Sequence, residues 1–256
     1  MIVNERDDQF LMINQHEHAM VSGELALQWK RKFLIRSKLR EEADWAVSQH
    51  DRAWIPLDEH PIWNEASNRP YSFIDYPLKE KLSAYQRGVK EVSDRSIYAA
   101  ILCSKHYQSF FSKDSEDPLV IQFIMEEEKR RENLRTMMKI CVPSDIFQVH
   151  FDRLQFCDNL SLYVCMQEPG ISKEQEVPWF RNGFRQQFDE APEGVMPRWI
   201  DGSHVSLDPF PFEQPLEVRI PYRLVKRDSI EEKGLEVAYK EAEIHERCVV
   251  FIPHSF

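Results

Sequence analysis

Three segments with helical periodicity each place a residue type that binds metals on the face expected to be buried. His18 begins an apolar stripe whose next members follow at spacings of three and four, and His50 lies within a second stripe with Asp51 beside it. Asp158 has apolar neighbours four residues away on both sides. Because a buried, unpaired carboxylate is costly, two of them need compensation, which a shared cation supplies. The sequence therefore predicts a metal site formed by His18, His50, Asp51 and Asp158.

Each of these residues also has a structural explanation when it is taken alone. A single His on an apolar stripe is compatible with a hydrogen-bonded core histidine, and a His-Asp dipeptide arises easily by chance. An arginine or a backbone cap would also pair with Asp158. The joint order, His, then His-Asp, then Asp on separate helices, favours the metal site. His150 falls near the helical face of Asp158 and is a further candidate, with a solvent-facing or capping histidine as the alternative.

The predicted ligand set indicates a chemistry. Two imidazole nitrogens and two carboxylate oxygens suit a divalent ion such as Mn, Fe, Co, Ni, Zn or Mg. Such an ion lowers the pKa of a bound water and polarises a phosphoryl group or another electrophile, which favours hydrolysis. His106 could be the general acid for the leaving group or a hydrogen-bond donor behind the ligands. Lys105, Arg52 and Arg69 are the candidate cations for binding the phosphate.

Six helical segments between residues 14 and 166 would position these side chains. They are expected to begin near Asn14, Ser37, Pro77, Ser96, Asp117 and Pro143, and Pro56 is expected to end the second. The charge run 126–131 is interpreted as a solvated face. A strand hairpin is predicted within residues 1–15, strands at 216–222 and 248–252, and a short helix within 229–242. The predicted fold is mainly α, and α+β overall, with residues 1–166 as hairpin plus helical core and 167–256 as a small antiparallel β subdomain packed on it. The N-terminal hairpin is expected to complete the sheet of this subdomain.

The order His…His-Asp…Asp resembles the HD-domain superfamily of metal-dependent phosphohydrolases. By position, His18 resembles the ligand of the first helix, His50-Asp51 the doublet, and Asp158 the closing Asp. The chain looks closer still to an uncharacterised bacterial family of HD-like proteins, through matches at residues 15–19, 22–23, 50–54, 68–73, 104–106 and 207–212. This resemblance implies an HD-like bundle of about six helices and a metal-dependent phosphohydrolase.

The sequence departs from that pattern at two places. Related sequences commonly carry Gly where this chain has Ala53, so the resemblance does not imply a tight backbone approach there. Binuclear members add two histidines between the doublet and the final Asp, and only His106 is well placed to be one of them. One metal ion is therefore expected rather than two. The departures also allow a second interpretation, a catalytically silent HD-like module that binds a small ligand or a protein.

Composition limits the remaining classes of function. The 256 residues carry 43 acidic and 33 basic side chains and a formal net charge of -10, which argues against nucleic acid as a partner. Only 7 residues are glycine, and neither GxGxxG nor GxxxxGK[ST] occurs, which argues against Rossmann and P-loop nucleotide binding. The five cysteines form no CxxC pair, and neither a signal peptide nor a membrane-spanning run is evident. We expect a soluble cytoplasmic protein with a small, phosphorylated substrate and no membrane partner; the oligomeric state is not indicated.

Overall fold

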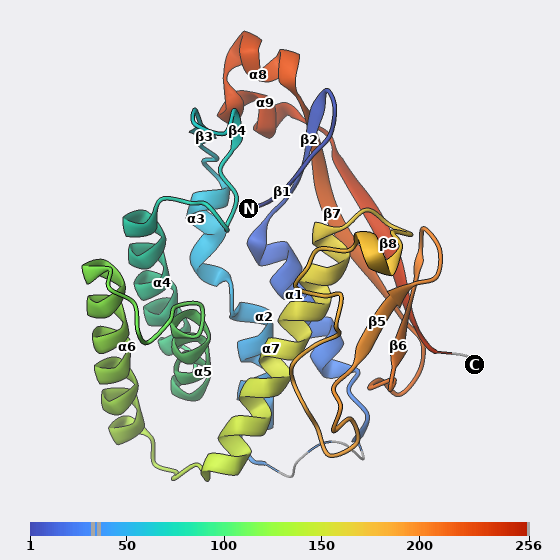
Figure 1. Ribbon diagram of the computed structural model, residues 1–256. Coiled ribbons are helices and arrows are strands. Elements are labelled where there is room, and N and C mark those ends of the chain that lie inside the picture. The colour runs from blue at the N-terminus through green and yellow to red at the C-terminus, as the bar shows by residue number, and fades with distance from the viewer. Residues whose placement is uncertain (32–33, 35–36, 255–256) are drawn as a thin grey trace.

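A computed structural model of the protein describes residues 1–31, 34 and 37–254, and a six-stranded sheet forms one side of it (Figure 1). The order of the strands across the sheet is β1-β2-β7-β8-β6-β5. Their bounds are Ile2–Glu5 (β1), Gln9–Ile13 (β2), Met196–Trp199 (β5), His204–Asp208 (β6), Leu216–Lys226 (β7) and Ile244–Pro253 (β8). A separate ribbon pairs β3 (Trp63–Asn64) with β4 (Arg69–Pro70).

The sheet is mixed, because β6 runs parallel to β8 while the other neighbouring strands are antiparallel. The N-terminal hairpin joins the sheet through β2, where Phe10 lies opposite Val225 of β7. The fold is therefore α+β, and the expectation of a mainly α, HD-like bundle with a small antiparallel subdomain is wrong. Alternating residues reveal a strand but not its partner, and β5 and β6 are short strands that were not predicted.

The helices between the hairpin and residue 166 follow the predicted periodicity closely. Those of the central part are α1 (Gln15–Leu27), α2 (Arg40–Gln49), α3 (Ile55–Asp58), α4 (Leu78–Ser93), α5 (Ile97–Gln108), α6 (Pro118–Met137) and α7 (Ser144–Met166). Short 3₁₀ turns are η2 (Arg52–Trp54) and η3 (Lys173–Gln175). Pro56 does not end a helix: it lies in the first turn of α3, where no backbone N–H is required. The predicted helix at 229–242 is two helices, α8 (Arg227–Lys233) and α9 (Leu235–Glu241), separated by Gly234 with φ 81°.

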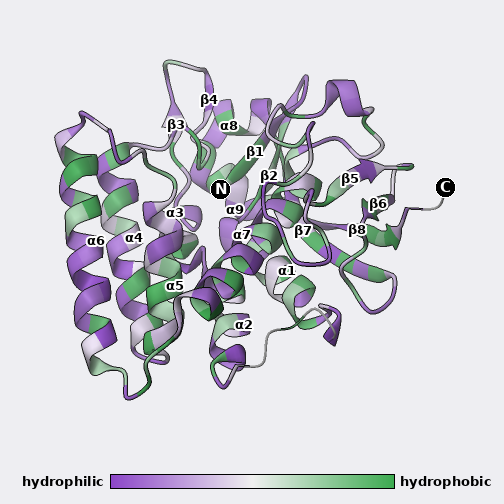
Figure 2. Ribbon diagram, turned by 60° about the horizontal axis from the view of Figure 1, so that its bottom comes forward, coloured by the Kyte–Doolittle hydropathy of each residue, from purple (hydrophilic) through white to green (hydrophobic). Residues whose placement is uncertain are grey.

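The helices are arranged in layers away from the sheet (Figure 1). Helices α1 and α7 lie next to the sheet, α2 and α5 follow, and α4 and α6 are farthest from it. One buried apolar cluster extends from the helices into the sheet and includes Leu25, Phe156, Val218 and Phe251. The middle of α6 is hydrophilic in Figure 2. The inner helices α1, α2, α5 and α7 thus surround the middle of the helical layer, where the predicted ligands lie.

Candidate metal centre

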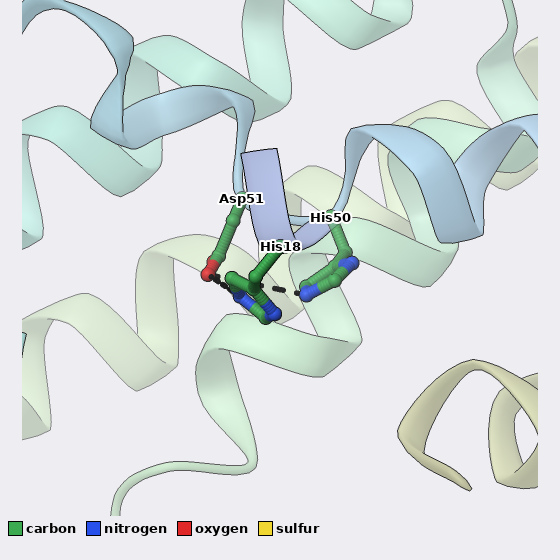
Figure 3. Close-up of side chains that lie close together, drawn as sticks. All are labelled: His18, His50 and Asp51. Atoms are coloured by element: carbon green, nitrogen blue, oxygen red, sulfur yellow. Dashed lines mark hydrogen bonds and ion pairs between the residues drawn. The ribbon is translucent and has the colours of Figure 1, made fainter. Parts of the chain in front are cut away.

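Five side chains converge at the centre of these four helices. His18 comes from α1, His50 and Asp51 from the end of α2, His106 from α5 and Asp158 from α7, and all are buried. The ring nitrogen of His18 and the carboxylate of Asp51 point toward each other in Figure 3, with His50 beside them. The separations are 2.9 Å (His18 Nε2–Asp51 Oδ2), 3.3 Å (His50 Nε2–Asp158 Oδ1), 3.8 Å (His106 Nε2–Asp158 Oδ2), 3.9 Å (His50 Nε2–Asp51 Oδ2) and 4.0 Å (His18 Nε2–Asp158 Oδ1).

Each of these separations is short enough for two ligands of one metal ion. Two atoms that each bind one ion at about 2.0–2.2 Å are at most roughly 4.4 Å apart, and all five separations are shorter. Within the described part of the chain, neither ring nitrogen of His106 has a hydrogen-bond partner, nor does Asp51 Oδ1. Buried polar atoms without partners are rare unless an ion or water completes them. The buried His and Asp groups can therefore hold a divalent metal ion.

Hydrogen bonds behind the ligands orient their rings. His50 Nδ1 donates to the carbonyl of Val47 at 2.7 Å, so its Nε2 faces the cluster. His18 Nδ1 lies 2.7 Å from Ser161 Oγ, and that hydroxyl donates to the carbonyl of Asp158 at 3.0 Å. In the tautomer in which His18 Nδ1 donates to Ser161, the lone pair of Nε2 is available to a metal ion; without an ion, Nε2 is 2.9 Å from Asp51 Oδ2 and can donate to it instead. Such partners commonly fix the tautomer of metal-binding histidines.

The charges of the cluster favour a cation. Burial alone would lower the pKa of His50, but the carboxylates of Asp51 and Asp158 outweigh it and raise the pKa to about 9. Burial would raise the pKa of Asp158, but the hydrogen bond and charge of His50 hold it at about 2. Burial lowers the pKa of His106 to about 4, so its ring is neutral at pH 7. Without an ion, two ionised carboxylates thus share the site with a protonated His50.

Two glycines allow the helices to approach closely enough to place the doublet. A Cβ on Gly23 of α1 would lie 2.6 Å from Ser48 Cβ, and one on Gly88 of α4 would lie 2.7 Å from Ala53 Cβ. The tight backbone approach that was not expected at Ala53 is therefore present. The glycine that permits it lies on the opposing helix rather than in the turn after Asp51.

A cavity of about 670 Å³ opens onto the carboxylates of the cluster. Its floor includes Asp51 and Asp158. Gln15 lines it too, and its Nε2 donates to Asp51 Oδ2 at 3.1 Å. The cationic residues of the lining are Lys81 and Arg185. Aromatic residues form much of the remaining wall: Trp54, Phe73, Tyr85, Phe110, Phe111, Trp179 and Phe184.

The three cations predicted to bind phosphate lie outside this lining. Arg52 pairs with Glu91 at 2.9 Å and Arg69 with Asp75 at 3.2 Å. The Lys105 ammonium lies over a phenylalanine ring. Their role in binding phosphate remains a prediction. The sequence did not single out Lys81 and Arg185, the two cations that line the cavity. Lys81 lies in the first turn of α4, after Pro77. In the sequence, a lysine at such a position looks like an ordinary solvent-facing lysine.

Three other histidines lie in or near the helical core. His106 is not part of the cavity lining but lies behind its floor, with its ring centroid 4.9 Å from that of His50. His150 lies apart from the ligand clusters, and its Nδ1 is 2.8 Å from the Tyr98 hydroxyl. His16, on α1, is half-buried. Only His106 of these three is placed to contribute to the metal centre.

The charged run of α6 supports the helix that carries His106. Glu127 and Arg131 are buried, so the interpretation of this run as a solvated face is wrong at these two positions. Arg131 donates to Ser104 Oγ at 2.9 Å and also to Gln108 on α5. A buried arginine is retained where its protons have acceptors. These contacts fix α6 against α5 on both sides of His106.

Comparison with known proteins places the chain in a family. Residues 1–227 match the family described as "Protein of unknown function (DUF3891)". No curated protein and no solved structure matches the chain. The family found is DUF3891 and not an HD-domain family, so the assignment to the HD-domain superfamily is wrong. No described helix combines the length and apolarity needed to cross a membrane. The chain belongs to the DUF3891 family, whose function is unknown.

Proposed function

We propose that this protein is a metal-dependent hydrolase that cleaves a phosphoester of a small molecule or nucleotide. The observation that carries the proposal is a cluster of buried histidines and aspartates whose two carboxylates, Asp51 and Asp158, line a cavity of about 670 Å³ with cations in its wall. A divalent ion held there would supply a water of lowered pKa and would polarise the phosphoryl group.

The residues of the cavity have separate tasks in this reaction. Gln15 holds Asp51 through its Nε2, and its Oε1 has no hydrogen-bond partner in the described residues and can accept from a water or substrate hydroxyl. Lys81 and Arg185 would balance the charge of the phosphate. In the reaction the oxygen of a water would bond to phosphorus, the bond from phosphorus to the leaving oxygen would break, and the proton given up by the water would pass to that oxygen. A monoester would yield an alcohol and phosphate, and a diester an alcohol and a phosphomonoester.

His106 fits the role of a metal ligand better than that of a general acid. A general acid must reach the leaving oxygen, and His106 lies behind the cavity floor with its Nε2 3.8 Å from Asp158 Oδ2. The residues that would hold the ion form two overlapping groups, His18 with His50 and Asp51, and His50 with His106 and Asp158.

Metal analysis and activity assays on matched variants test the proposal. Asp158→Asn removes a proposed ligand, and Asp152→Asn removes a partly buried carboxylate from the same helix outside the cluster. We expect Asp158→Asn to lose bound metal and hydrolysis of phosphoester substrates, and Asp152→Asn to keep both. The assay would use phosphomonoesters, phosphodiesters and nucleotides with Mn, Fe, Co, Ni, Zn and Mg.

The same assays distinguish an enzyme from a silent module. Equal metal content in Asp158→Asn and in the unmodified protein would refute the metal site. Metal bound by the unmodified protein, with no hydrolysis of any phosphoester under any of these ions, would refute the hydrolase and favour a module in which the metal is structural.

A further inference from the structure

The charges that line the cavity indicate which class of phosphoester it takes, an inference that rests on the proposed function. The charged residues of the lining are Asp51, Asp158, Lys81 and Arg185, so the negative and positive side chains balance. A divalent ion would bring the total to about two positive charges. A phosphate monoester carries about −1.5 to −2 at pH 7, whereas a diester carries one negative charge. The charge of the loaded cavity matches the monoester.

Lys81 is held in the position that an anion-binding group requires. Its ammonium donates to the carbonyls of Phe73 at 3.1 Å and Ile74 at 3.4 Å, in the loop before α4. Within the described residues, no carboxylate lies close enough to form an ion pair with it; the nearby Asp75 pairs with Arg69 and only partly offsets the lowering of the Lys81 pKa by burial. The two carbonyls are the acceptors of the ammonium among the described residues, which leaves its third proton for an anion. A partly desolvated ammonium without a carboxylate partner interacts strongly with an incoming anion.

The aromatic wall indicates the other part of the substrate. Trp179 is 55% exposed, and its ring approaches that of Phe73 edge-on at a centroid distance of 6.4 Å. Both rings line the cavity, together with Phe110 and Phe184. Aromatic faces and edges of this kind pack against planar rings. The leaving group that they fit is therefore apolar and planar.

We infer that the substrate is a phosphomonoester dianion with a planar, ring-bearing leaving group, and that Lys81 binds its non-bridging phosphate oxygens. Lys81 is thus assigned as a specificity-determining residue, with Arg185 as a second cation nearer the solvent.

Inorganic phosphate is the probe for Lys81, titrated calorimetrically into the metal-loaded protein. Lys81→Met should weaken phosphate binding by roughly ten- to a hundredfold, the loss expected for one charge-assisted hydrogen bond. Lys81→Arg should retain most of the affinity. Lys79→Met removes an exposed lysine from the same helix and should have no effect. Metal content should be the same in all variants, because Lys81 is not a ligand.

Substrate preference provides the second measurement. The unmodified protein should have a higher kcat/KM for p-nitrophenyl phosphate than for bis(p-nitrophenyl) phosphate, and Lys81→Met should lower this ratio at least about tenfold. A general loss of structure would lower both activities together. Unchanged phosphate affinity in Lys81→Met, or a preference for the diester, would overturn the inference and leave the hydrolase intact. Phosphate binding that depends on Lys81 without any phosphoester hydrolysis would refute the proposed function and support Lys81 as an anion-binding residue.

Discussion

Gly88→Ala tests whether the contact between α4 and the turn after the His-Asp doublet sets the geometry of the metal centre. The new Cβ would lie 2.7 Å from Ala53 Cβ, 2.8 Å from Ala53 Cα and 2.9 Å from Ala53 N. Carbon atoms pack without repulsion at about 3.5–4.0 Å, so α4 and the turn must separate by roughly 0.8 Å. Two of the three obstructing atoms belong to the backbone, and no side-chain rotation relieves them.

The expected cost follows from two opposing contributions. Overpacking of a core by one methyl group costs about 1–3 kcal/mol, and the backbone contacts favour the upper half of that range. Alanine in place of glycine inside a helix gains about 1 kcal/mol. The free energy of unfolding should therefore fall by about 1–2 kcal/mol, which lowers the Tm by roughly 2–8 °C for a chain of this size.

Urea denaturation followed by circular dichroism measures the stability change, and chelator competition measures the metal affinity. Because Ala53 is two residues after Asp51, the displaced turn should also weaken metal binding. Gly202→Ala is the control, since a Cβ there meets nothing within 4 Å. Adding Ala53→Gly to Gly88→Ala should restore part of the loss, because it removes the closest of the three contacts. A Gly88→Ala protein as stable as the unmodified one, with the same metal affinity, would refute the reasoning.

Two further predictions concern the hydrogen bonds of buried histidines. Ser161→Ala removes the acceptor of His18 Nδ1 and should weaken metal binding roughly 10–100-fold in a chelator competition, whereas Ser83→Ala on the surface of α4 should not. For His150, burial and then the charge of a neighbouring arginine lower the pKa from 6.5 to about 4. As the pH falls below 6.5, the unfolded chain therefore takes up a proton at this residue that the folded protein does not bind. Stability is therefore lost in that window, and His150→Gln should lose about 2 kcal/mol less than the unmodified protein between pH 7 and pH 5 in urea denaturation. An equal pH dependence in the two proteins would contradict this, and His60→Gln, at an exposed position, should behave like the unmodified protein.

The inner faces of the helices could be predicted from the sequence because helical periodicity is a local property. His18 and Asp158 recur with apolar residues at spacings of three and four, so their burial followed from the pattern alone. The order and residue types suggested that they share one site, and the structure brings them together with the doublet. Their role as metal ligands remains a prediction.

The sheet and the cavity wall could not be predicted in the same way. The parallel pairing of β6 with β8 depends on a register between segments about 40 residues apart, which no local pattern records. The position of Lys81 at the cavity depends on the loop before α4 and on residues 179–185, and neither segment has helical or strand periodicity. The sequence therefore indicated the floor of the site but not its walls.

The pairing of β2 with β7 has a consequence for the order in which the site forms during synthesis. Helix α1, which carries His18, begins two residues after β2, and β2 is held in the sheet by Phe10 opposite Val225. The strand that holds β2 in the sheet, and with it the start of the helix of His18, is therefore synthesised more than two hundred residues after β2. Contacts of such long separation form slowly. On a ribosome, the cluster of buried histidines and aspartates would become complete only after β7 has emerged, when all of its residues have already been synthesised.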